Sequence, residues 1–192
     1  MKTYLTFLCA FFLFSVSINA QDSAPASKQV GVTTLPIIYL NNGIGTDGGF
    51  GGIAVYGNYG WIFKNYNVVG LRPFWGYVDS GSSRNQHLQS LGSNVYYRRY
   101  FNRNRLSFFV DANIGLGYIW YSSDSPSFEE TLQELNGLMF NYAFGPGVDF
   151  EIKNGWNVEL IIQYLQMQNI DHPEDTNVGK SLIPSIGVQK FF

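Results

Sequence analysis

From about residue 30 onward, bulky apolar residues alternate with small or polar residues at nearly every second position. The pattern is clearest over 106–120, 138–152 and 156–164, where the even-numbered positions carry no charged residue. The positions between them are occupied mainly by Gly, Ser, Asn, Asp and Glu. A period of two residues indicates β-strands with two unlike faces. The chain is therefore expected to be all-β.

The same alternation recurs over 51–63, 68–78, 88–101 and 181–192, and a less regular first strand is expected at about 30–40. These segments make eight strands, an even number. Their connections alternate in length, with short turns such as 102–105 followed by long segments. Short turns at one end and long loops at the other are typical of a transmembrane β-barrel with periplasmic turns. The prediction is an eight-stranded antiparallel up-and-down transmembrane barrel.

Alternation alone leaves open which face points outward, because a soluble ligand-binding barrel would place the apolar face inside. Three features favour the membrane arrangement. Only 14% of the residues are charged, against about 25% in a typical soluble domain. The interior of an eight-stranded barrel is just wide enough for side chains, which suits the small polar face. The apolar face has almost no charge, and its exceptions Arg99 and Lys190 lie at strand ends.

Aromatic residues of the apolar face gather near the strand ends, as in the interfacial girdles of membrane barrels. One girdle is expected from Trp61, Phe63, Phe101, Phe150, Trp156 and Phe192. The other is expected from Tyr77, Tyr118, Trp120, Phe140 and Tyr164.

The N-terminus has the form of a secretory signal peptide. Lys2 precedes a short apolar run from Leu5 to Phe14, and small residues follow up to Ala20. The domains expected are a signal peptide over 1–20, a flexible leader over 21–29 and the barrel over 30–192. A membrane anchor is the alternative for the first segment, but the run is short for a spanning helix.

The combination resembles the small bacterial outer-membrane β-barrel proteins of the OmpA/OmpX- and OmpW-like kind. The resemblance rests on the signal peptide, the strand count, the terminal Phe192 and the hairpin over 95–118 (VYYRRYFNRNRLSFFVDANIGLGY). It implies the outer membrane of a Gram-negative bacterium, and assembly machinery that reads the C-terminal strand. Family members usually carry another aromatic residue two positions before the last, where this chain has Lys190, so the last register stays open by one residue.

Charged residues on the polar face are the main candidate site. Unpaired buried charges are expensive, and pairing with hydrogen bonds is the usual remedy. We expect an ionic network that plugs the lower half of the lumen, formed by Arg72, Arg98, Asp111, Asp149, Glu151 and Glu159. A gated ion path is the alternative interpretation.

The long segments are acidic, and 121–136 also has the signals of a short helix. Acidic side chains available for loop interactions are Asp124, Glu129, Glu130, Glu134, Asp171, Glu174 and Asp175. They could contact lipopolysaccharide through bridging cations, or a basic partner. The formal net charge of −2 argues against a nucleic-acid partner.

Catalysis is a weaker possibility. Outer-membrane lipid-modifying enzymes use His with Ser and an acid, and His87 with Ser90 or His172 with Asp171 could imitate that arrangement. No metal or cofactor is expected, because two histidines make a poor metal site. The sequence thus predicts a monomer with a structural or surface-interaction role. A narrow, porin-like pore is the first alternative and a lipid-modifying enzyme the second.

Overall fold

A computed structural model describes residues 27–39, 50–63, 66–80, 86–123, 136–171 and 177–192. They form eight strands: β1 Lys28–Tyr39, β2 Phe50–Phe63, β3 Asn67–Ser80, β4 Gln86–Tyr100, β5 Leu106–Ser123, β6 Gly137–Lys153, β7 Trp156–Asn169 and β8 Asn177–Phe191. Among these residues, no helix is long and apolar enough to cross a membrane. The predicted signal peptide lies outside the described residues, and so do residues 124–135, where a short helix or an irregular loop is expected.

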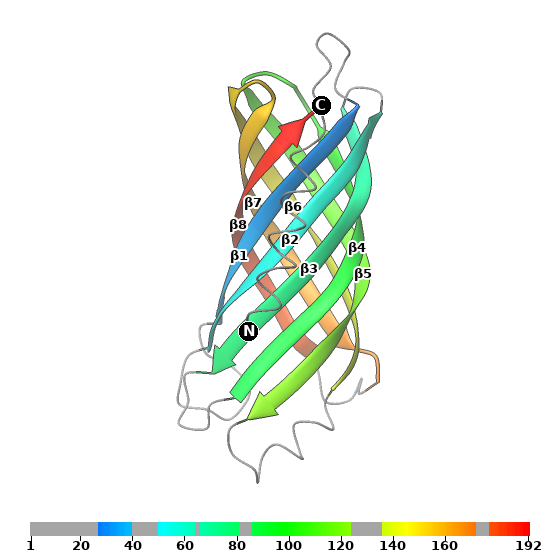
Figure 1. The fold of residues 1–192 in the computed structure, drawn as a ribbon, viewed down its shortest axis with the longest axis vertical. Helices are drawn as coiled ribbons and strands as arrows, with labels where there is room; N and C mark the ends of the chain where they lie inside the picture. The colour runs from blue at the N-terminus through cyan, green and yellow to red at the C-terminus, as the bar shows by residue number, and fades with distance from the viewer. Residues whose placement is uncertain (1–26, 40–49, 64–65, 81–85, 124–135, 172–176) are drawn as a thin grey trace.

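Each strand pairs antiparallel with the next, and β1 pairs with β8 to close the barrel. The strands are steeply tilted, and the C-terminus lies at the end that carries the short turns (Figure 1). The predicted fold class is therefore confirmed. Strand β1 begins at Lys28, so two residues of the expected leader are strand, and Gln29 is fully buried.

The turn between β6 and β7 shows how the sequence closes its hairpins. Asn154 and Gly155 have φ angles of 52° and 75°. An Asn-Gly pair with positive φ at both positions is the preferred two-residue hairpin, because its twist matches that of the strands. The predicted turn at this place is observed.

The bulky alternating face points outward. Exposed side chains include Leu106, Phe108, Val110, Ile114 and Leu116 of β5, whereas the intervening Ser107, Asp111 and Asn113 are buried. The same parity holds on the other strands where side chains are described. The soluble arrangement with an apolar ligand cavity is thus wrong for this fold.

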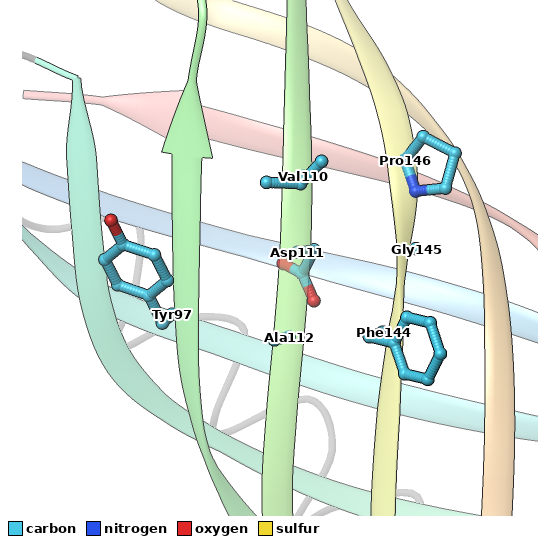
Figure 2. A pocket seen from close by; sticks show the side chains of 7 residues that line it. All are labelled: Tyr97, Val110, Asp111, Ala112, Phe144, Gly145 and Pro146. Atoms are coloured by element: carbon cyan, nitrogen blue, oxygen red, sulfur yellow. The ribbon is translucent and has the colours of Figure 1, made fainter.

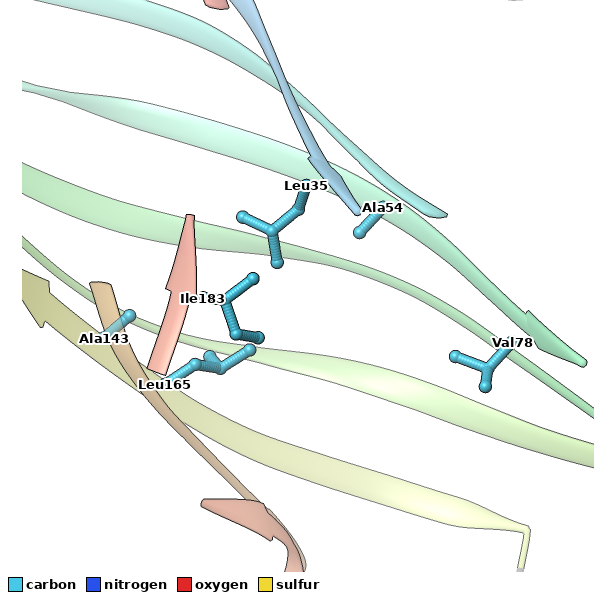
Figure 3. Close-up of a cluster of buried hydrophobic side chains, with 6 residues drawn as sticks. All are labelled: Leu35, Ala54, Val78, Ala143, Leu165 and Ile183. Carbon is cyan, nitrogen blue, oxygen red and sulfur yellow. The ribbon is translucent and has the colours of Figure 1, made fainter. Parts of the chain in front are cut away.

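The lumen is less polar than the sequence suggests. One apolar cluster, Leu35, Ala54, Val78, Ala143, Leu165 and Ile183, fills it on the long-loop side (Figure 3). A second cluster toward the short turns consists of Val68, Tyr96, Tyr100, Phe109 and Ile161. The inner face, expected to be small, polar and occasionally charged, thus also carries large rings. Tyr96 and Phe109 fit inside the lumen because the positions facing them are glycines.

Proline in a sheet usually lies at a bulge, a strand end or an edge, and β6 carries Pro146 between Gly145 and Gly147. Pro146 stays in register with Val110 of β5, while the ladder to β7 has no paired residues at Gly145 and Pro146. Proline has no N–H to donate, which accounts for an interrupted ladder without an inserted residue. The register shifts lie instead between Glu151 and Lys153 and between Met167 and Gln168.

Candidate functional site: a closed polar ring across the lumen

The polar residues of the lumen are brought together by strand register. Arg98 of β4 lies opposite Asp111 of β5, and Asp149 of β6 lies opposite Glu159 of β7. All four side chains point inward and are almost completely buried. Because the inner positions recur every second residue, parity alone fixes their direction.

Two arginines form the centre of the network. Arg72 donates from Nη1 and Nη2 to the two carboxylate oxygens of Asp111, at 2.8 Å each. Arg98 donates from Nε to Asp111 Oδ2 at 2.9 Å and from Nη1 to Glu159 Oε2 at 2.7 Å. Charge-assisted hydrogen bonds of this kind are about twice as strong as neutral ones. The two guanidinium groups therefore compensate the two carboxylates inside the barrel.

Uncharged side chains complete a closed ring. Arg72 Nε donates to Asn58 Oδ1 at 2.6 Å, and Asn58 Nδ2 donates to Thr33 Oγ1 at 2.8 Å. The Thr33 hydroxyl donates to Glu159 Oε1, which returns the ring to Arg98 and Asp111. We call these residues, together with the hydrogen-bond partners described in the next paragraph, the polar ring: Thr33, Asn58, Arg72, Arg98, Asp111 and Glu159.

Four further side chains join the polar ring, one of them, Asp149, through the Tyr100 hydroxyl. Gln163 Nε2 donates to Asp111 Oδ1 at 2.9 Å, and the Gln189 amide donates to Glu159 Oε2. Tyr100 donates its hydroxyl to Asp149 Oδ2 at 2.6 Å and accepts from Arg98 Nη1 at 3.2 Å. The contacts thus involve a residue from each of the eight strands: Thr33, Asn58, Arg72, Arg98, Asp111, Asp149, Glu159 and Gln189.

Asp149 and Glu159 are two carboxyl groups on directly paired positions, an arrangement that is unfavourable when both are charged. Arg98 reaches Glu159 directly and Asp149 through the Tyr100 hydroxyl, so one cation serves both. Arg98 Nη2 and Asp149 Oδ1 have no hydrogen-bond partner within the described residues.

Aromatic rings cover the flat faces of both guanidinium groups. The guanidinium carbon of Arg72 lies 4.4 Å from the ring centre of Tyr96, and that of Arg98 lies 4.0 Å from the ring centre of Phe109. Desolvated cation–π contacts of this kind contribute about 2 kcal/mol. Carboxylates at the edges and rings at the faces leave little room for solvent around the charges.

Gly187 of β8 is required for the contact between Thr33 and Glu159, which lie on either side of it. A Cβ at this position would lie 2.6 Å from Glu159 Oε1 and 2.8 Å from Thr33 Oγ1. Gly187→Val is expected to lower the free energy of unfolding by about 1–3 kcal/mol, the usual range for overpacking. The measurement is urea unfolding of the barrel in vesicles.

Gly51→Val is the matched control, because a Cβ there meets nothing within 4 Å. The same substitution should leave stability unchanged or slightly higher, since valine favours strands. Equal losses at both positions would contradict the assigned role of Gly187.

Five of the six predicted network residues meet in the lumen, and Glu151 does not. Its Oε1 accepts from the Gly155 backbone N–H at 3.3 Å in the β6–β7 turn, so its place in the network was wrong. Sequence reasoning missed Thr33, Asn58, Gln163, Gln189 and Tyr100, which are polar residues of the inner face near the same height. Inner-face parity combined with distance from the short turns would have indicated them.

Of the two pairs considered for catalysis, His87 and Ser90 do not come together. His87 Nδ1 lies 2.9 Å from the Tyr77 hydroxyl and 3.7 Å from Asp79 Oδ1, on the outer face of the barrel. Ser90 is buried on the opposite face of the same strand. His172 lies outside the described residues. Within the described ranges, no group of three or more His, Cys, Asp or Glu side chains is placed to hold a metal ion.

The aromatic residues expected at the two rims all lie on the outer face. Lys190 lies over the rings of Trp156 and Phe192, at 5.1 and 5.2 Å, and Phe191 turns inward against Tyr100. These contacts settle the register of the last strand, with Lys190 outward. Of the acidic loop residues only Asp171 is described, and its Oδ2 accepts from the Leu138 backbone N–H at 2.7 Å.

A shallow apolar hollow of about 320 Å³ lies on the outer wall where β4, β5 and β6 run side by side (Figure 2). It arises because Ala112 is a small residue between the bulkier Tyr97 and Phe144 on the paired strands. Its apolar lining suits contact with lipid chains.

An apolar outer wall, a closed antiparallel sheet and a lumen filled by side chains together define a transmembrane β-barrel of the outer-membrane type. Solved structures of similar fold include the outer membrane enzyme PagL, with a TM-score of 0.50, 14% identity, and 85% of this chain and 98% of that chain covered. Neisserial surface protein A gives a TM-score of 0.49 with 11% identity, over 90% of this chain and 100% of its own. Ail, the attachment invasion locus protein of Yersinia pestis, gives a TM-score of 0.47 with 12% identity, and the match covers 88% of this chain and 99% of that chain. No family model and no curated protein matches the sequence.

Proposed function

We propose that the chain is a monomeric protein of the outer membrane of a Gram-negative bacterium. Its lumen is closed, and it acts through its long loops in a structural or surface-interaction role. A shared fold does not define an activity, so the proposal is argued from the lumen. The observation that carries it is the polar ring, which joins all eight strands across the interior.

The lumen is also filled on either side of the polar ring. The cluster around Leu35 and Leu165 lies toward the long loops, and the cluster around Val68 and Phe109 lies toward the short turns. A solute would have to separate Arg98 from Asp111 and Glu159, and breaking a buried pair costs about 3–5 kcal/mol. This favours a closed barrel over the narrow pore.

Purified protein in planar bilayers is expected to give no stable, wide openings. A general porin inserted in the same bilayer serves as the positive control, and heat-modifiable migration in gels shows that the barrel is folded. Stable openings from folded protein would support the pore in place of the closed barrel.

The working surface is proposed to be the long-loop end. The acidic residues of these loops, with Asp171 among them, would bind lipopolysaccharide through divalent cations or dock a basic partner. β8 closes the barrel by pairing with β1, and the proposal keeps this C-terminal strand as the one that the assembly machinery recognises. The role proposed is not catalytic, and the placement of His87 and Ser90 on opposite faces of the barrel wall supports this for the first of the two pairs considered.

A further inference from the structure

Positive charge outside the lumen is concentrated at one end of the barrel. The six described cationic side chains that lie outside the lumen all lie at the short-turn end: Lys28, Arg99, Arg103, Arg105, Lys153 and Lys190. We call them the basic rim. The only described acidic side chain among them is Glu151. Toward the opposite end the described charged side chains are the acidic Asp79 and Asp171, and β8 carries one lysine there, Lys180, which pairs with Gln166.

Aromatic rings hold several of these cations at the level of the membrane interface. Lys190 Nζ lies between Trp156 and Phe192, and the Arg105 guanidinium lies 5.1 Å from the centre of the outward-facing Phe150 ring. Arg103 lies 4.9 Å from the ring centre of Phe191 near the mouth of the lumen. Long cationic side chains beside interfacial aromatics place their charges in the headgroup layer.

The protein supplies little counter-charge there. Arg99 donates from Nη1 to the Asn67 amide oxygen at 3.0 Å, which is a neutral acceptor. Within the described part of the chain, Lys28, Arg99, Arg105, Lys153 and Lys190 have no carboxylate at ion-pairing distance. Cations fixed in a headgroup layer without protein carboxylates select an anion from that layer.

We infer that the basic rim is a binding surface for the phosphate headgroups of anionic phospholipids in the leaflet at the short-turn end. Its lysines lie closest to the interfacial tryptophans where β7, β8 and β1 are adjacent. Trp156 pairs with both Lys153 and Lys190, and Lys28 pairs with Trp61 on the next strand. The inference rests on the membrane-spanning arrangement of the proposed function and adds the class of lipid that the barrel selects.

The test uses tryptophan fluorescence in vesicles. In a Trp75→Phe, Trp120→Phe background, the remaining reporters Trp61 and Trp156 both lie at the basic rim. The full chain is reconstituted in equimolar phosphatidylcholine and phosphatidylglycerol, with brominated chains on one lipid at a time. A cation near an anionic surface raises affinity about fivefold. We expect stronger quenching by brominated phosphatidylglycerol, with a relative binding constant of about five or more at low salt, decreasing as salt is added.

The triple variant Lys28→Gln, Lys153→Gln, Lys190→Gln should bring this constant close to that of phosphatidylcholine. Asp79→Asn, which changes a charge at the other rim, should leave it unchanged. Equal quenching by the two lipids, or a preference that survives the triple variant, would overturn the inference. Heat-modifiable migration of every variant is scored separately, so loss of lipid selection in an inserted barrel is distinct from failure to form a membrane barrel.

Discussion

Replacing Arg98 by methionine is expected to lower the free energy of unfolding by about 3–5 kcal/mol. The side chain is fully buried, and among the described residues it is the one cation that hydrogen-bonds both Asp111 and Glu159. Methionine fills much of the volume over Phe109, so the loss comes mainly from carboxylates left buried with too little positive charge. Urea unfolding in vesicles, followed by tryptophan fluorescence, measures the effect.

Two variants separate charge pairing from packing. Arg99→Met changes the neighbouring arginine of the same strand, whose side chain points outward, and should shift stability by less than about 1 kcal/mol. Combining Arg98→Met with Glu159→Leu removes an uncompensated carboxylate and should restore part of the loss. If the double variant were as unstable as the sum of its single variants, the ion pair would not be the source of the effect.

Ile114→Arg is expected to cost about 2–4 kcal/mol of stability in a bilayer, the range for arginine on the lipid face at mid-membrane. Ile114 lies in the middle of β5, and 53% of its surface is exposed on the outer wall. The same substitution in a water-soluble barrel would expose a charge to solvent and would leave stability nearly unchanged. The unfolding titration therefore tests the direction in which the apolar face points.

Ile152→Arg is the depth-matched comparison. Ile152 is similarly exposed, at 58%, but it lies beside Lys153 at the end of β6. Near the interface the cost should decrease to about 0–1 kcal/mol. A loss of equal size at both positions, or none at either, would contradict a barrel that spans the bilayer with its short turns at one surface.

The barrel could be predicted because two independent signals agreed. Period-two alternation gives the direction of each side chain, and alternating connection lengths give the strand order. Neither signal depends on long-range contacts, since a meander pairs each strand with its neighbour in sequence. Small errors occurred where local patterns end, as at Lys28, where the first strand begins earlier than the hydrophobic pattern does.

The polar ring could be predicted only in part. Charged residues stand out in an otherwise apolar strand pattern, and buried charges are expected to pair. The ion pairs observed among Arg72, Arg98, Asp111 and Glu159 follow this expectation. The uncharged members Thr33 and Asn58 are ordinary strand residues in the sequence, and they reach the network only through the register of β1 with β2 and the closure of β1 onto β8. Glu151 keeps the inner parity and pairs with Asn157, but it lies two residues beyond Asp149 at the turn end of β6, where the Gly155 backbone N–H is its partner.

The connection between Glu159 and the first strand makes closure of the barrel cooperative. Glu159 receives hydrogen bonds from Thr33 of β1, Arg98 of β4 and Gln189 of β8. In an open sheet β1 and β8 are apart, and β4 is too far from β7 to share a carboxylate, so Glu159 would lose two of these donors. In a partly closed barrel the Glu159 carboxylate would therefore be poorly paired in apolar surroundings. The polar ring thus favours the fully closed barrel over partly paired sheets.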